Sequence, residues 1–148
     1  MSSNTKPRKI IAVNKDTVNH TPKSLLKASK PKRVVITTYL DEQKDIRSFR
    51  VEGHAGYAVS GNDIVCAAIS TLTICAVNGL EQYLSSPPQS EVKDGFLECT
   101  VPQLQSETDR LSARVILGTM MLGLEQIRMT YGSKYIDFEQ RRWTPCYN

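Results

Sequence analysis

A long apolar segment, residues 63–84, constrains the fold of this chain more than any other feature. Its apolar side chains are distributed over most faces of a helix: Ile64, Val65, Ala68, Ile69, Leu72, Ala76, Val77 and Leu80. Asn62 is the expected N-cap, Asp63 suits the first turn, and Pro87 and Pro88 prevent continuation. A helix with so little polar surface must be covered by other elements, or partly by a second subunit. The segment therefore predicts a central, buried helix.

The regions around this helix predict strands and one further helix. The expected strands are residues 33–40, residues 46–53 and the hairpin 91–101, with an additional edge strand at 135–138. Lys93-Asp94-Gly95 is the turn signal of the hairpin. Ser106 and Asp109 have the spacing of a capping box, which opens a second helix to about residue 129. This β-β-α-β-β-α order predicts an α/β (α+β) two-layer sandwich with a mainly antiparallel sheet.

The positive charge of the chain is concentrated at its start. Residues 1–33 hold nine basic residues and one acidic residue, which gives them a charge of +8, although the whole chain carries only +4. We therefore divide the chain into a basic N-terminal extension, residues 1–32, and a folded domain, residues 33–148. A segment of this composition is typical of a disordered extension, and its charge also suits contact with rRNA.

The cysteines and histidines favour thiol chemistry over metal binding. The chain has four cysteines without C-x-x-C spacing and two histidines, so we expect no metal and no cofactor. No apolar run approaches the roughly 18 to 20 residues that cross a bilayer, and no secretory signal is visible. We therefore expect a cytoplasmic protein with reduced thiols and no contact with a membrane.

The pair His54 and Cys66 has the arrangement that a thiol protease requires. His54 ends a predicted strand, a glycine-rich loop follows, and Cys66 lies near the start of the long helix. The thiolate is the attacking species, and both a helix N-terminus and a nearby imidazolium stabilise it. We therefore predict Cys66 as the nucleophile and His54 as the general base.

Three further residues complete the predicted site. Asp63 and Ser70 lie three residues before and four residues after Cys66, on the same helix face. Asp63 is a candidate third triad member that orients His54, while Ser70 and Gly53 are candidate substrate-binding residues. Each residue also has a structural interpretation: a cysteine in an apolar helix is usually a core residue, and an acid at a helix start is common.

The segment GHAGYAVSGNDIVCAAIS closely resembles the signature of the bacterial ribosomal-processing cysteine protease family, Prp. The resemblance extends over residues 33–140 and implies a cytoplasmic, homodimeric peptidase without a metal. It implies that His54 and Cys66 are the catalytic pair, with Asp63 as the motif aspartate. The implied substrate is the N-terminal extension of a large-subunit ribosomal protein, and the implied mobile loop is residues 55–62. The basic N-terminal extension departs from the family pattern.

Two other functions compete with this interpretation. The first is a non-catalytic ribosome-binding module whose basic extension contacts rRNA; the presence of His54, Asp63 and Cys66 together favours the enzyme instead. The second is a redox sensor based on Cys66. Cys75 is nine residues further along the helix and therefore lies on the opposite side, so it is unsuited to be the resolving thiol.

Overall fold

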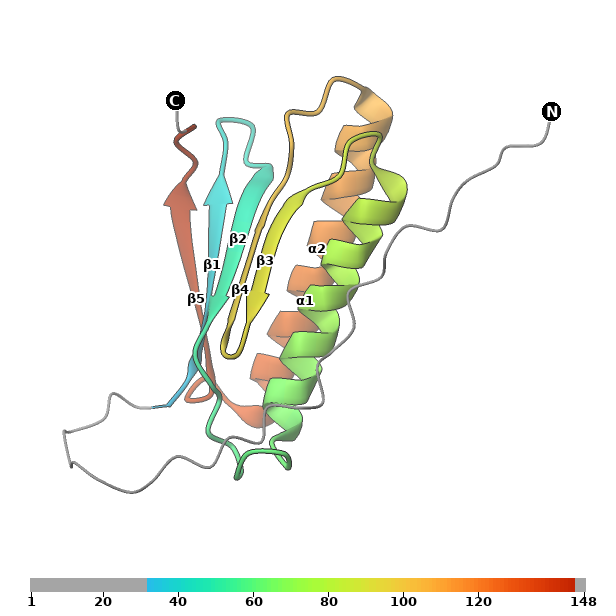
Figure 1. Ribbon diagram of the computed structural model, residues 1–148. Coiled ribbons are helices and arrows are strands. Elements are labelled where there is room, and N and C mark those ends of the chain that lie inside the picture. Colours follow the sequence, from blue (N-terminus) through green and yellow to red (C-terminus); the bar gives the residue numbers. More distant parts are fainter. Residues whose placement is uncertain (1–31, 146–148) are drawn as a thin grey trace, which may run out of the picture.

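The computed structural model describes residues 32–145, which form a five-stranded sheet with two helices on one face (Figure 1). The elements are β1 (Val34–Leu40), β2 (Ile46–Glu52), α1 (Ile64–Tyr83), β3 (Gln89–Lys93), β4 (Phe96–Thr100), α2 (Glu107–Tyr131) and β5 (Ile136–Arg142). This arrangement confirms the predicted α+β fold. Cys146 and all of the basic N-terminal extension except Lys32 lie outside the described residues.

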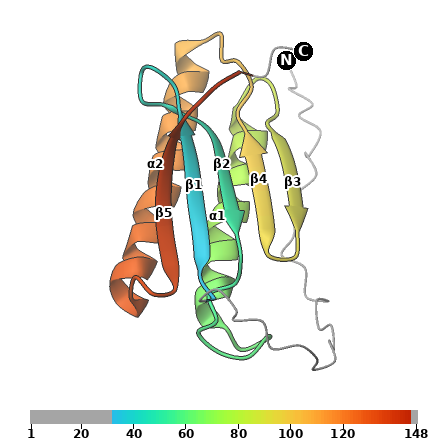
Figure 2. The same ribbon diagram turned by 90° about the vertical axis from the view of Figure 1, so that its left-hand side faces the viewer.

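The strands follow the order β3-β4-β2-β1-β5 across the sheet (Figure 2). Neighbours from β3 to β1 pair antiparallel, as predicted, and β5 is an edge strand, also as predicted. However, β5 is longer than expected and runs parallel to β1, so the sheet is mixed. The reason is the path of α2, which returns the chain along the full length of the sheet and delivers it at the end where β1 begins.

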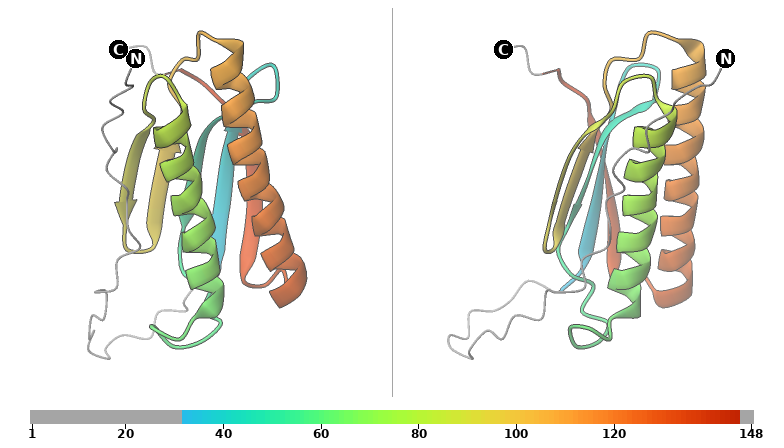
Figure 3. Two further views of the ribbon diagram at one scale, coloured as in Figure 1. Left: turned by 90° about the vertical axis from the view of Figure 1, so that its right-hand side faces the viewer. Right: turned by 45° about the vertical axis from the view of Figure 1, so that its right-hand side comes forward.

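The two helices lie antiparallel and cover the same face of the sheet (Figure 3). The core between the two layers is apolar, with Phe49, Ile36, Leu80, Leu117 and Leu124 among its fully buried side chains. We expected no apolar run of membrane-spanning length, but that expectation was wrong for α1, which by length and composition is the one helix of the described residues that could cross a membrane. Seven of its residues are buried in the fold, including Val65, Ile69 and Leu80, so its composition is that of a core helix.

The start of α1 differs from the prediction by one residue. Asp63, not Asn62, is the N-cap, because its side chain accepts a hydrogen bond from the backbone N–H of Cys66. Ser106 caps α2 as predicted, and Gly132 ends it. The start of α1, the loop after β2 and the β3–β4 turn all lie at one end of the molecule (Figure 1). The predicted catalytic residues are therefore close together in space.

Candidate active site

Asp63 organises the loop that separates His54 from Cys66. Its Oδ1 atom accepts the hydrogen bond from the N–H of Cys66 at 2.9 Å. Its Oδ2 atom accepts a hydrogen bond from the N–H of Tyr57 at 3.0 Å. The Tyr57 ring in turn contacts Tyr131 and Tyr135 edge-on, with ring centroids 5.5 and 5.2 Å away. Both carboxylate oxygens thus hold backbone, and they fix the loop to the N-terminus of α1.

Cys66 is the third residue of α1, and its half-buried thiol points back toward the loop. Its Sγ atom accepts a hydrogen bond from the N–H of Ala55 at 3.1 Å. Ala55 is itself fully buried, which anchors this part of the loop in the core. Because Ala55 directly follows His54, the contact brings the predicted base to the same region as the predicted nucleophile.

His54 lies against the turn between β3 and β4. The backbone N–H of Gly53 donates a hydrogen bond to the carbonyl of Gly95 at 2.9 Å, which fixes the start of the loop to this turn. The imidazole packs on Gly95 so closely that a Cβ atom there would lie 2.6 Å from Nε2. The same Nε2 atom lies 3.9 Å from Oδ1 of Asp94. Both Gly95 and Asp94 of the hairpin turn therefore lie next to the ring.

A cleft of about 290 Å³ joins these residues. Gly53, His54, Cys66 and Ser70 all line it, so the structure brings four of the five predicted site residues to one surface. The remaining walls are mainly apolar and come from β2, α1 and the β3–β4 hairpin; they include Val51, Ile69, Ile74, Phe96 and Leu97. Asp63, the N-cap of α1, does not line the cleft. Within residues 32–145, its hydrogen bonds go to Tyr57 and Cys66 and none goes to His54.

The surroundings of Cys66 favour the protonated form of its thiol. Burial is the main influence and raises the pKa of Cys66 above its ordinary value. The N–H group of Ala55 opposes this effect, and the Asp63 carboxylate raises the pKa further. The helix N-terminus alone predicted the opposite direction. The difference arises first from burial of the thiol and second from the Asp63 carboxylate, because the residue that caps the helix is itself an anion.

The other described cysteines have different surroundings. Cys75 is exposed on α1, and Cys99 is buried in β4. Burial, followed by the nearby carboxylate of Glu81, raises the pKa of Cys99 to about 12. Neither of them lines the cleft of Cys66. Among the described residues, no group of three or more His, Cys, Asp or Glu side chains is arranged to hold a metal ion.

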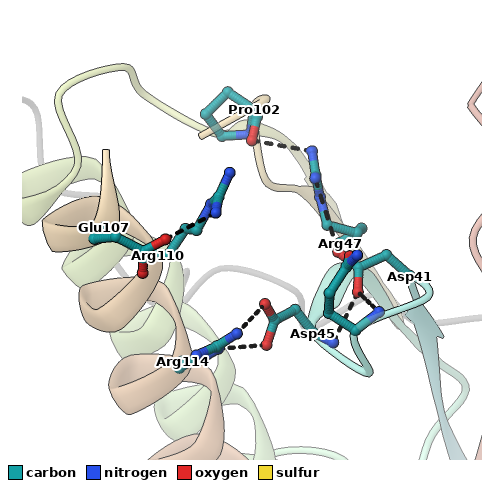
Figure 4. Close-up of polar contacts among 8 residues, drawn as sticks. Asp41, Asp45, Arg47, Pro102, Glu107, Arg110 and Arg114 are labelled. Carbon is teal, nitrogen blue, oxygen red and sulfur yellow. Dashed lines mark hydrogen bonds and ion pairs between the residues drawn. The ribbon is translucent and has the colours of Figure 1, made fainter. Parts of the chain in front are cut away.

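A second cavity, of about 390 Å³, lies at the opposite end of the molecule, between the β1–β2 turn and the start of α2. Figure 4 shows its charged groups, which pair with one another. Arg114 donates two hydrogen bonds to the carboxylate of Asp45, at 2.6 and 2.9 Å. Arg110 pairs with Glu107, and Arg47 donates to the backbone of the β4–α2 connection. The pair of Arg114 and Asp45 joins α2 to the β1–β2 turn, and the named contacts include no nucleophile, so the cleft at Cys66 is the candidate active site.

Sequence reasoning did not assign any role at the site to Asp94 and Gly95. They were identified only as a turn, because Lys93-Asp94-Gly95 is a strong local hairpin signal. The register that places this turn under His54 comes from pairing of β2 with β4, which sets Glu52 opposite Phe96. That pairing joins residues 44 to 52 positions apart, from Glu52–Phe96 to Ser48–Thr100, so the local sequence pattern does not reveal it.

Comparison with known proteins adds independent evidence. The family described as "Cysteine protease Prp" matches residues 34–137. The Prp of Bacillus subtilis, called a ribosomal processing cysteine protease, is 29% identical over 90 residues, which are 60% of this chain and 80% of that protein. The protein of the same name from Staphylococcus aureus is 24% identical over 98 residues, which are 66% of this chain and 91% of that protein.

A solved structure shares the fold. The crystal structure of S. aureus Prp with a covalently linked product peptide superposes with a TM-score of 0.63 at 24% identity, covering 73% of this chain and 99% of that chain. The family match spans most of the described domain and contains both His54 and Cys66. The chain therefore belongs to the Prp family of cysteine proteases.

Proposed function

We propose that this protein is a site-specific cysteine endopeptidase in which Cys66 is the nucleophile and His54 the general base. The observation that carries the proposal is that both residues, which come from different elements, line one cleft with apolar walls. Thiol attack on an amide needs a nucleophile and a base that meet at one substrate-sized surface. The cleft also contains Gly53 and Ser70, which suit contacts to the peptide backbone.

The reaction follows from this arrangement. His54 removes the thiol proton, and the sulfur of Cys66 attacks the carbonyl carbon of the peptide bond. His54 then returns the proton to the leaving amine, and a water molecule that His54 deprotonates hydrolyses the thioester. Burial raises the pKa of Cys66 and thus opposes thiolate formation, so His54 has to remove the proton for the attack. A shift of the loop 55–62, which lies between His54 and Asp63, brings the base to the sulfur when substrate binds.

The proposed substrate is the N-terminal extension of a large-subunit ribosomal protein. Two observations support this: the relatives are called ribosomal processing cysteine proteases, and a solved S. aureus structure is described as a complex with a substrate peptide. A cytoplasmic location follows from such a substrate. The alternative, a ribosome-binding module without catalysis, gives no reason for a histidine and a cysteine in one cleft.

The deciding experiment is mass spectrometry of a peptide that spans the ribosomal extension, after incubation with purified protein. Wild type cleaves at one bond, whereas Cys66→Ala and His54→Ala do not. Cys75→Ala is the matched control, since it removes an exposed thiol from the same helix outside the cleft. Cleavage by folded Cys66→Ala, or no cleavage by folded wild type, would reject the proposal.

We also propose a homodimer that forms through the outer face of α2. Four apolar side chains are exposed there, directly opposite the buried face of the helix: Leu111, Val115, Leu122 and Met129. Their spacing of four, seven and seven residues makes one continuous stripe along α2. A stripe of this length on an otherwise charged helix is typical of an interface between helices. Sedimentation velocity should show a dimer for wild type and a monomer for Leu122→Glu.

A further inference from the structure

We infer that Asp94, and not Asp63, is the carboxylate that positions His54 for the reaction, with Gly95 providing the space for the ring. The inference deepens the proposed function and rests on it. Three contacts carry the argument: a backbone hydrogen bond, a packing contact that only glycine allows, and a carboxylate next to the imidazole. All three involve the β3–β4 turn.

The first two contacts fix the position of the ring. The N–H of Gly53 donates to the carbonyl of Gly95 at 2.9 Å, which ties the residue before His54 to the turn. Gly95 has a φ angle of +64°, and a Cβ atom there would lie 2.6 Å from Nε2 of His54. A side chain at this position would push the imidazole away from the turn and out of its present place. Glycine at position 95 therefore allows both the backbone conformation of the turn and the close packing of the imidazole.

The third contact selects the nitrogen that performs the chemistry. Oδ1 of Asp94 lies 3.9 Å from Nε2 of His54, and both residues line the cleft. A carboxylate beside Nε2 favours the tautomer that keeps its proton there, and it stabilises the imidazolium that forms when the ring accepts a second proton. Nδ1 is then the nitrogen that takes the proton of Cys66. Among the described residues Asp63 makes no hydrogen bond to His54, and its two oxygens accept from the N–H groups of Tyr57 and Cys66.

The exposure of the pair explains why the contact is loose at rest. The side chains of His54 and Asp94 are 57% and 62% exposed, and an ion pair in water contributes little. A peptide lying in the cleft covers these groups and removes water, which strengthens the attraction between them. Asp94 therefore acts after substrate binding, and its loss should lower kcat while leaving KM nearly unchanged.

Steady-state cleavage of the extension peptide tests the inference with matched variants of the full chain. Asp94→Asn should lower kcat about tenfold, in the range typical of partners that orient a catalytic residue, with KM within about twofold of wild type. Asp94→Glu should restore most of kcat, because it returns the carboxylate. Glu91→Gln is the control: it removes one negative charge from the same hairpin, at a residue that does not itself line the cleft although its partner Lys93 does.

The outcomes separate the two proposals. If wild type cleaves and Asp94→Asn retains the wild-type kcat, the inference is wrong and the proposed function stands. It is equally wrong if Glu91→Gln loses as much activity as Asp94→Asn, or if Asp94→Glu restores none. If folded wild type does not cleave at all, the proposed function itself has failed. A circular dichroism spectrum of each variant verifies the fold.

Discussion

The backbone N–H of Ala55 donates a hydrogen bond to the Sγ atom of Cys66, so the nucleophile is tied to the residue that directly follows the predicted base. The contact has two consequences. It keeps the loop close to the start of α1, and it partly offsets the effect of burial, which raises the pKa of the thiol. Without substrate, the Sγ atom of Cys66 is therefore held in position by Ala55, while its surroundings favour the protonated thiol.

The first prediction concerns the reactivity of Cys66 without substrate. Burial raises its pKa, so the thiolate fraction near neutral pH is below that of an ordinary cysteine and increases as the pH rises. Iodoacetamide should modify Cys66 more slowly than the exposed Cys75 at neutral pH, and the rate should increase through the alkaline range. Peptide mapping by mass spectrometry measures both sites in one sample. Faster modification of Cys66 at neutral or acidic pH would instead indicate a preformed thiolate–imidazolium pair.

The second prediction separates the two effects of Asp63. Its charge raises the pKa of Cys66, so Asp63→Asn should lower that pKa and accelerate alkylation severalfold near neutral pH. Cleavage should nevertheless decrease, because an amide has one oxygen and is therefore unable to accept from the N–H groups of both Tyr57 and Cys66. Glu125→Gln on α2 controls for the change in net charge. Slower alkylation, or unchanged cleavage, would contradict this account.

The third prediction compares two glycines in the same loop. Gly53 has φ +96°, and a Cβ atom there would lie 2.5 Å from the backbone carbonyl oxygen of Arg33. Gly61 has a similar φ of +88° but open space around it. Gly53→Ala should therefore displace His54 and abolish cleavage, whereas Gly61→Ala should cost only the strain of the left-handed backbone, about 1–2 kcal/mol. Urea unfolding and peptide cleavage measure the two effects, and equal behaviour of the two variants would refute the argument.

The fourth prediction concerns the N-terminal extension. Lys32 packs on the active-site loop, since a Cβ atom at Gly56 would lie 2.7 Å from the Cβ atom of Lys32. Deleting residues 1–31 should therefore spare cleavage of a short peptide, while deleting residues 1–32 also removes this contact and should lower kcat modestly. The two truncations form a matched pair that differs by one residue. Loss of peptide cleavage in the shorter deletion would show that residues 1–31 contribute to the site.

Local signals predicted most of the elements. The start of α2 was predicted from the spacing of Ser106 and Asp109, which are close in the sequence. The β3–β4 turn was predicted from Asp94 and the glycine that follows it. The direction of β5 was not predictable in this way, because it depends on the path that α2 takes across the sheet. The N-cap was displaced by one residue since Asn62 and Asp63 are both good caps, and only the three-dimensional structure shows which side chain faces Cys66.

The site could be predicted only in part for the same reason. His54 and Cys66 are separated by twelve residues and one loop, so their meeting follows from the strand–loop–helix pattern. The support of His54 by the β3–β4 turn depends on the β2–β4 register, which no local pattern encodes. The rise in the pKa of Cys66 likewise required knowledge of its burial and of the Asp63 carboxylate.

The final prediction uses the second buried thiol. Burial raises the pKa of Cys99 to about 12, while in the unfolded chain it returns to about 9. Between these values the unfolded state loses its proton and the folded state keeps it, so the folded state is progressively disfavoured as the pH rises.

The free energy of unfolding should therefore fall with pH above about 9, with Cys99 contributing up to about 1.4 kcal/mol per pH unit. Below that range its contribution is fully present. Cys99→Val, which has no ionisable group, should show a shallower slope, and Cys75→Val on the exposed face of α1 should keep the wild-type slope. Urea unfolding at several alkaline pH values measures the difference between variants, in which the titration of lysine and tyrosine side chains cancels. Identical slopes for wild type and Cys99→Val would mean that water reaches Cys99 in the folded state.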